Sequence, residues 1–176
     1  MPKIRNLAEL ESIRCQAQHS LSMQQKKVLV CCGTGCIAGG SLLIYDRIKE
    51  TCRARGIDVC VELKHEPHGE NIGLKASGCH GFCEMGPLLK IEPLGVLYIK
   101  VKLSDCDEII ERSIIGDEVI ERLLYTQNGK AYQHQEEIPF YHKQTRIVLS
   151  NCGQTNAEDV LEYIAKGGYS ALSKVL

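Results

Sequence analysis

The sequence has few aromatic residues and almost no net charge, and both shortages limit what the protein can be. It contains no Trp, and aromatic residues make up 5% of 176 residues, while apolar residues make up 44%. Such a composition fits a compact α/β protein built from small aliphatic side chains. The 21 basic residues nearly balance the 22 acidic ones. Without a broad positive field to attract phosphate groups, we expect no nucleic-acid partner.

Long apolar runs are also missing. None approaches the roughly 20 residues that a membrane-spanning helix needs, and the polar start at residues 1–6 lacks the apolar stretch of a signal peptide. We therefore expect a cytoplasmic protein with no membrane span. Ten cysteines in such a protein are not expected to form disulfides, because cytosolic thiols are kept reduced. Metal or redox chemistry is the better explanation of the cysteines.

Hydrophobic periodicity predicts an ordered series of short elements. Strands are expected at 28–30, 57–63, 72–76, 88–91, 96–101 and 146–149, and helices at 6–19, 41–55, 104–112, 117–125 and 156–165, with a last short helix after Gly167 and Gly168. Residues 64–70 read as a polar loop. The order βαβ followed by ββα predicts an α/β fold with a mixed sheet and matches the layout of thioredoxin.

Two glycine-rich cysteine loops follow predicted strands of this sheet. The first contains Cys31 and Cys36 with four residues between them, and the second contains Cys79 and Cys83 with three residues between them. Because both loops leave strands of one sheet, the four thiols can meet at one end of it. Four thiolates in two pairs are what a 2Fe-2S cluster requires. The glycines allow backbone N–H groups to approach the sulfur atoms.

Other interpretations of these loops compete with a cluster. A structural zinc site would favour two-residue gaps within each pair, and the gaps here are four and three. A catalytic thiol needs a base, but His80 beside Cys79 is expected to be solvated or to support the ligands. By spacing alone Cys32 could replace Cys31 as a ligand. The other cysteines, Cys15, Cys52, Cys60, Cys106 and Cys152, are expected to act as small apolar residues.

The two loops, CCGTGCIAGGS at 31–41 and GCHGFCEMGP at 78–87, resemble the thioredoxin-like 2Fe-2S domain of NADH-dehydrogenase-type flavoprotein subunits. The family spacing C-x4-C and C-x3-C implies Cys31, Cys36, Cys79 and Cys83 as ligands. The nearest likeness is to the amino-terminal part of the NADH-binding subunit of electron-bifurcating or NAD-dependent iron hydrogenases. Related formate dehydrogenases and the respiratory complex I flavoprotein share the module.

The resemblance continues beyond the loops and implies a division of the chain. Residues 1–26 would be an amino-terminal helical extension, 27–125 the ferredoxin domain and 126–138 a linker. Residues 139–176 resemble the lead-in to a flavin domain, through motifs such as QTRIVL at 144–149 and EYIAKGGY at 162–169. The FMN and NADH site and the 4Fe-4S cysteines of the family do not occur in this sequence. By itself the chain is therefore not expected to oxidise NADH.

Three functions are compared on this basis. The first is one-electron transfer through a single 2Fe-2S cluster, with other iron-sulfur or flavin subunits of a redox complex as partners. The second is a structural or docking module whose metal site, 2Fe-2S or zinc, carries little electron traffic. The third, a thiol oxidoreductase, would need a Cys-x-x-Cys pair at the start of a helix, and the sequence has none.

Overall fold

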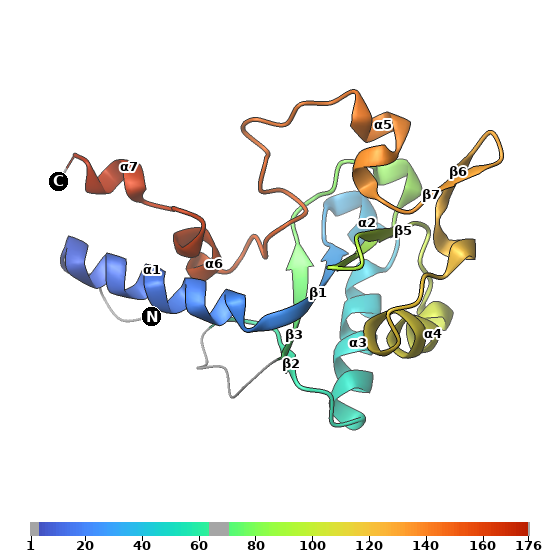
Figure 1. Cartoon of the computed structure of the whole chain (residues 1–176), viewed down its shortest axis with the longest axis horizontal. Helices are drawn as coiled ribbons and strands as arrows, with labels where there is room; N and C mark the ends of the chain where they lie inside the picture. Colours follow the sequence, from blue (N-terminus) through green and yellow to red (C-terminus); the bar gives the residue numbers. More distant parts are fainter. Residues whose placement is uncertain (1–3, 64–70, 176) are drawn as a thin grey trace.

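A five-stranded mixed sheet lies at the centre of the protein (Figure 1). The computed structural model describes residues 4–63 and 71–175, so the predicted loop at 64–70 and the first three residues lie outside the described part. The strands are β1 Gln24–Cys31, β2 Val59–Cys60, β3 Asn71–Ser77, β4 Leu89–Glu92 and β5 Val96–Tyr98, arranged in the order β2-β3-β1-β4-β5. β1, β2 and β3 are parallel, while β4 and β5 are antiparallel to their neighbours. The predicted α/β class with a mixed sheet is confirmed.

Short helices and one hairpin surround the sheet. The α-helices are α1 Leu7–Ser22, α2 Thr34–Ala38, α3 Ser41–Ala54, α4 Cys106–Glu108, α5 Pro139–His142, α6 Val160–Ala165 and α7 Ser170–Ser173. A π-helix follows α4 at Ile109–Ile115, and 3₁₀ turns occur at Cys83–Met85, Leu103–Asp105, Glu121–Leu123 and Gln135–Glu137. The hairpin consists of β6 Tyr125–Gln127 and β7 Lys130–Tyr132.

The register of β1 and β3 places the two cysteine loops side by side. Cys31, the last residue of β1, is paired with Ser77, the last residue of β3. Both strands therefore deliver their loops to the same edge of the sheet, because parallel strands have their carboxyl ends on one side. A backbone hydrogen bond of 2.9 Å from Cys32 N to Ser77 O fixes the starting points of the loops.

The main apolar core lies between one face of the sheet and α3, α4 and the π-helix. Alternate residues of β1, Val28 and Val30, point into this core and contact a helix face formed by Ile44 and Ile48 of α3. This alternation is the period-two pattern that the sequence shows. A smaller apolar cluster covers part of the opposite face and contains Cys31, Cys36, Phe82, Leu88, Leu97, Ile138 and Tyr141.

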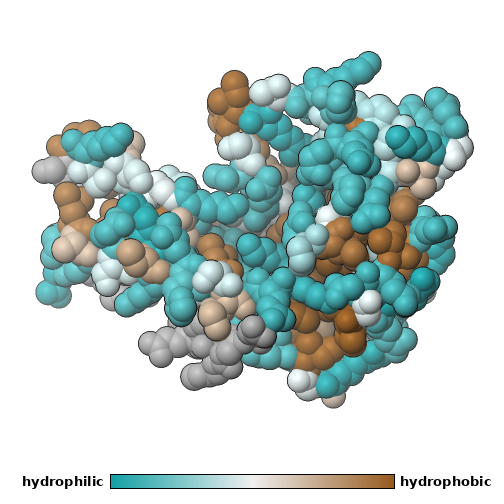
Figure 2. Space-filling view, viewed as in Figure 1, coloured by the Kyte–Doolittle hydropathy of each residue, from teal (hydrophilic) through white to brown (hydrophobic). Residues whose placement is uncertain are grey.

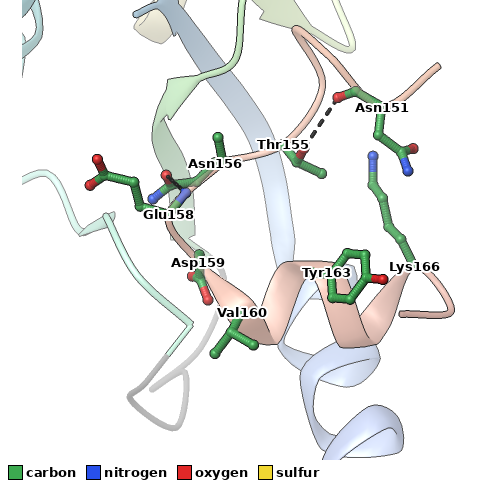
Figure 3. Close-up of a pocket in the computed structure, with 9 residues that line it drawn as sticks. Asn151, Thr155, Asn156, Glu158, Asp159, Val160, Tyr163 and Lys166 are labelled. Carbon is green, nitrogen blue, oxygen red and sulfur yellow. Dashed lines mark hydrogen bonds between the residues drawn. The ribbon is translucent and has the colours of Figure 1, made fainter. Parts of the chain in front are cut away.

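The carboxy-terminal segment is attached to the same opposite face. Lys75 of β3 forms an ion pair with Glu162 of α6, and both side chains are 2% exposed. Asp159 accepts hydrogen bonds from the α6 amides Leu161 N at 2.9 Å and Glu162 N at 3.4 Å, and from Leu63 N at 3.1 Å. Figure 3 shows Asp159 at the start of the α6 ribbon. Residues beyond 139 therefore supply part of the cover of the sheet.

α1 packs along α6 at the left of Figure 1, on the side of β1 away from α3 and α4. Arg14 and Gln18 of α1 donate hydrogen bonds to the carbonyls of Ile164 at 3.3 Å and Ala165 at 3.0 Å. Apolar atoms gather at this end of the surface in Figure 2, where α7 also lies. The helix begins as predicted, with Asn6 Oδ1 accepting from Glu9 N at 2.9 Å.

Three local predictions were wrong. Residues 146–149, predicted to be a strand, form turns, and Ile147 and Val148 are 81% and 93% exposed. Residues 117–125, predicted to be a helix, contain a 3₁₀ turn and the first residue of β6, because Asp117 has φ +56° and Ile120 N donates to Tyr98 Oη at 3.0 Å. The predicted helix from an Asn156 cap begins later, since Asp159 caps α6.

Two further elements differ in extent from the prediction. The strand expected at 57–63 pairs only at Val59 and Cys60, where it forms the edge of the sheet. The segment 126–138, expected to be a connector without regular structure, contains most of the β6-β7 hairpin. Its turn residues Asn128 and Gly129 both have positive φ, at 52° and 77°. Asn-Gly is the typical sequence of such a two-residue turn, so the sequence does contain a signal for this hairpin.

Candidate metal-thiolate site

Four cysteines gather where β1 and β3 end. Cys31 is the last residue of β1, and Cys36 lies within α2; both are 1% exposed. Cys79 is half-buried in the loop after β3, and Cys83 is exposed at the start of a 3₁₀ turn. The structure thus brings together the four residues that the sequence predicts as ligands. Their burial decreases from the sheet toward the surface.

The contacts join the four sulfur atoms in a row. Cys31 lies near enough to Cys36 and Cys79 for both thiols to lower its pKa. Cys79 Sγ lies 3.9 Å from Cys83 Sγ. Two thiolates bound to one tetrahedral metal at about 2.3 Å each would lie about 3.8 Å apart, so this separation suits ligands of a shared metal atom. Among residues 4–63 and 71–175, no three His, Cys, Asp or Glu side chains form a group placed to hold one metal ion.

The loops surround these thiols with hydrogen-bond donors that stabilise negative charge on sulfur. The pKa of Cys31 falls to about 6, because the neighbouring Cys36 thiol hydrogen-bonds with it and the backbone N–H groups of His80 and Gly33 also do so. Gly81 N donates to Cys79 Sγ at 3.3 Å. Burial nevertheless raises the pKa of Cys79, and the interaction with Cys31 raises the pKa of Cys36. Of the pair Cys31 and Cys36, Cys31 therefore becomes the thiolate first.

Cys32, the alternative ligand, lies outside this row. It lies beside Ser41, the first residue of α3, and burial raises the pKa of its thiol to about 11. Consecutive residues at the end of a strand point to opposite faces, so only one of Cys31 and Cys32 can join the other thiols. The remaining cysteines are separate from the row: Cys52 and Cys106 are buried in the core, Cys60 and Cys152 are half-buried, and Cys15 is exposed.

Glycines are required at two points of close contact with the thiols. A Cβ atom at Gly33 would lie 2.9 Å from Cys79 Sγ, and one at Gly86 would lie 2.8 Å from Cys36 Sγ. Real Cβ atoms do not approach other atoms so closely, and here the obstacles are the thiols themselves. The backbone of the first loop at Gly33 therefore packs against Cys79, and the backbone of the second loop at Gly86 packs against Cys36. Thiols from several elements are thus held close together by closely packed backbone, which suits a cluster bound through thiolates.

Aromatic side chains cover one side of the thiols. Phe82, between Cys79 and Cys83, is buried and stacks on Phe140 with ring centroids 4.5 Å apart, and Tyr141 meets it edge-on at 5.6 Å. Leu88 is fully buried, whereas Ile37 is 42% exposed. The apolar cover is therefore one-sided, and it includes two residues of α5 that the sequence did not connect with the site.

His80 is buried rather than solvated. Its Nε2 atom lies 2.9 Å from Ser77 Oγ, and Ser77 Oγ in turn donates to Val30 O at 3.0 Å. Burial, aided by the nearby positive charge of Lys90, lowers the pKa of His80 to about 4. The neutral imidazole thus connects the two parallel strands below the thiols. Arg146 donates to the carbonyl oxygen of His80 from the carboxy-terminal segment.

Two cavities lie beside the carboxy-terminal segment, and none of the four thiols lines either of them. One of about 270 Å³ lies beside α6 and is lined by Asn151, Tyr163, Lys166 and their neighbours, none of them a cysteine (Figure 3). Another, of about 440 Å³, is lined by Lys90, Tyr141, Arg146, Cys152 and their neighbours. A metal site held by thiols needs no cavity for a substrate, so these two cavities do not bear on the four thiols.

Comparison with known proteins places the chain beside small iron-sulfur proteins. A "Ferredoxin, 2Fe-2S" of Aquifex aeolicus is 46% identical over 48 residues, which is 27% of this chain and 43% of the relative. A "Ferredoxin, 2Fe-2S" of Clostridium pasteurianum is 36% identical over 62 residues, 35% of this chain and 61% of the relative. The chain thus matches about half the length of these relatives. No family model matches it.

Solved structures similar to the chain carry related names. The crystal structure of a wild-type thioredoxin-like [2Fe-2S] ferredoxin from Aquifex aeolicus is 26% identical and has a TM-score of 0.45, with 59% of this chain and 99% of that chain covered. A second structure of a thioredoxin-like [2Fe-2S] ferredoxin from that organism gives 0.44, at 61% and 96% coverage. The fold of this protein is defined by its own strand order and register. No helix among the described residues is long and apolar enough to span a membrane.

Proposed function

We propose that the protein transfers single electrons through one 2Fe-2S cluster held by Cys31, Cys36, Cys79 and Cys83. The observation that carries this proposal is the row of four thiols at the joined ends of β1 and β3. The names of the sequence relatives support the choice of cluster. The four-residue and three-residue gaps also distinguish the loops from the pairs that usually bind structural zinc.

The chain contributes ligands, hydrogen bonds and partial shielding from water. Bound at this site, a 2Fe-2S cluster supplies reversible one-electron chemistry. The parallel strands hold Cys31 and the Cys79 loop on a rigid sheet, and Gly81 N–H donates to a ligand sulfur atom. Cys83 is exposed while Cys31 and Cys36 are buried, so the Cys83 side is the expected route by which electrons enter or leave. No side chain has to donate a proton.

We propose further that the protein works inside a multisubunit NAD(H)-linked oxidoreductase of the cytoplasm, such as a bifurcating hydrogenase. Its partners would be other iron-sulfur and flavin subunits, and FMN, NAD and any 4Fe-4S cluster would bind elsewhere in that assembly. The motifs at 144–149 and 162–169 support this setting through their resemblance to a flavoprotein subunit. In this proposal residues 1–26, 27–125, 126–138 and 139–176 remain extension, ferredoxin domain, linker and lead-in.

A docking module with a metal site is the second candidate function. Its support is the exposed apolar run at Ile147, Val148 and Leu149, which are 81%, 93% and 60% exposed. Reduction by an NADH-linked or flavoprotein donor separates the two functions. Electron transfer requires that the protein be reduced at a rate comparable with turnover of the donor, whereas a docking module would bind the donor without being reduced.

Metal analysis of the wild type and of two cysteine variants tests the proposed cluster. Anaerobically purified protein should contain two irons and two acid-labile sulfides per chain and, after dithionite reduction, show the low-temperature paramagnetic resonance signal of one spin-half pair. Cys83→Ser should disturb the absorption bands and that signal, because it removes a thiolate ligand. Cys106→Ser should leave both unchanged, since Cys106 is buried in the core among apolar residues.

The outcomes of this experiment differ clearly. Stoichiometric zinc without sulfide, under conditions that preserve iron clusters, would replace the electron-transfer proposal by a structural metal site. Equal loss of the signal in the Cys83 and Cys106 variants would overturn the choice of ligands, because the effect would then follow general damage to the fold.

A further inference from the structure

Arg146 contacts the cysteine loop from outside the ferredoxin domain. Its guanidinium donates from Nη2 to the carbonyl oxygen of His80, the residue directly after Cys79. The same guanidinium lies over the ring of Tyr141, with Cζ 5.3 Å from the ring centroid. Arg146 is only partly exposed, although its neighbours Ile147 and Val148 are almost fully exposed. The side chain is therefore held between an aromatic ring and the loop.

The peptide bond that Arg146 contacts is also the one that donates to a ligand. The carbonyl of His80 and the N–H of Gly81 belong to one peptide group, and Gly81 N donates to Cys79 Sγ at 3.3 Å. A cation on the oxygen end of a peptide polarises it, so the N–H at the other end becomes a stronger donor. The positive charge of Arg146 thus reaches the sulfur atom both through space and through this peptide.

The backbone of the loop leaves room for this contact. Gly81 has φ +89°, and a Cβ atom there would lie 2.8 Å from Nη2 of Arg146. Any side chain at this position would collide with the guanidinium and would also be strained by the left-handed backbone. Arg146 is therefore bonded to the oxygen of the peptide whose N–H donates to Cys79 Sγ.

We propose that Arg146 is a positioning residue that raises the reduction potential of the cluster through the His80–Gly81 peptide. The inference rests on the proposed 2Fe-2S function and deepens it. Reduction adds one electron, supplied here by dithionite, to the cluster and its thiolates. Donors directed at the sulfur atoms stabilise the added negative charge and raise the potential. The carboxy-terminal segment would then regulate the cluster without supplying a ligand to it.

The test compares Arg146→Gln, Arg146→Lys and Lys143→Gln in the full chain. Lys143 is exposed in the same segment, so its variant removes the same charge without touching the loop. Potentiometric titration followed by paramagnetic resonance should give a lower midpoint for Arg146→Gln, with an equilibrium constant for reduction that falls about tenfold, which is about 59 mV for a one-electron couple. The midpoint of Arg146→Lys should fall less than that of Arg146→Gln, and the midpoint of Lys143→Gln should equal that of the wild type.

A second readout reports on the hydrogen bond itself. Resonance Raman spectra should show a shift of the iron–cysteine stretching bands in Arg146→Gln, together with a smaller change on exchange into D₂O than the wild type shows. A general charge effect would leave these bands unchanged. A merely structural role for Arg146 would change the thermal unfolding temperature while leaving the midpoint of the loaded protein unaltered.

The possible failures can be told apart. If the wild type holds no iron and sulfide, the proposed function fails before Arg146 is considered. If it holds the cluster but Arg146→Gln has the wild-type midpoint, or shares its shift with Lys143→Gln, the role of Arg146 is overturned. If Arg146→Gln cannot retain the cluster, the midpoint and Raman spectrum of Arg146→Lys test the proposal instead, because an ammonium cannot fully reproduce the contact that the guanidinium makes. A wild-type midpoint and Raman spectrum in that variant would refute the proposal.

Discussion

The buried ion pair between Lys75 and Glu162 allows a quantitative test of how the carboxy-terminal segment is attached. Both side chains are 2% exposed, and Glu162 also accepts from Asn156 N at 3.0 Å. Glu162→Gln keeps an oxygen for Asn156 but leaves the Lys75 ammonium without a counter-charge inside the protein. Removing one partner of such a pair costs about 3–5 kcal/mol in the free energy of unfolding. For a chain of this size that equals a fall of about 6–20 °C in Tm.

The measurement is urea unfolding followed by circular dichroism, with Glu111→Gln as the control. Glu111 pairs with Arg55 at 3.2 Å on the surface, where the two side chains are 63% and 36% exposed. Its loss should change stability by less than about 1 kcal/mol, because exposed pairs contribute little. A loss below about 1 kcal/mol in Glu162→Gln, or one equal to the control, would refute the argument that Lys75 is isolated from water by α6.

Two further predictions concern the thiol site. Cys31→Ser should lower the iron content and alter the visible absorption bands, whereas Cys32→Ser should leave both as in the wild type, because Cys32 lies outside the row and burial raises the pKa of its thiol to about 11. The reverse result would exchange the two assignments. Gly86→Ala should reduce cluster occupancy several-fold in the same iron and sulfide assay, since the added Cβ would lie 2.8 Å from Cys36 Sγ, while Gly78→Ala, whose Cβ would have 3.7 Å of clearance, should retain the cluster. Equal occupancy in the two alanine variants would contradict the close packing of Gly86.

The core elements could be predicted because local patterns and tertiary packing agree there. α3 was expected at 41–55 and occupies Ser41–Ala54, with Gly56 in the left-handed conformation after its end. The strand expected at 72–76 forms β3 at Asn71–Ser77. In both cases one buried face produces the period that the sequence shows. The convergence of the two cysteine loops followed from the same reasoning, because parallel strands bring their carboxyl ends together.

The errors occur where a distant contact decides the local structure. Residues 146–149 have strand-forming side chains, but a strand needs a neighbour, and the structure provides none for them in the part of the chain that it describes. Ile120 donates its N–H to the Tyr98 hydroxyl, which also lies 2.7 Å from Ser113 Oγ, and the predicted helix there is lost. Neither Tyr98 nor Arg146 could be assigned its partner by periodicity, since their contacts join residues far apart in sequence.

The same limitation explains why the sequence alone does not predict how residues 139–176 are attached to the sheet. Besides the aromatic contacts of α5 with Phe82, the attachments of this segment include single polar contacts: Glu162 with Lys75, Asp159 with Leu63 N and Arg146 with the carbonyl of His80. Polar contacts of this kind leave no period in the sequence. Glu162 fixes α6 to β3, Asp159 fixes the start of α6 to the turn at Leu63, and Arg146 reaches the loop that carries Cys79.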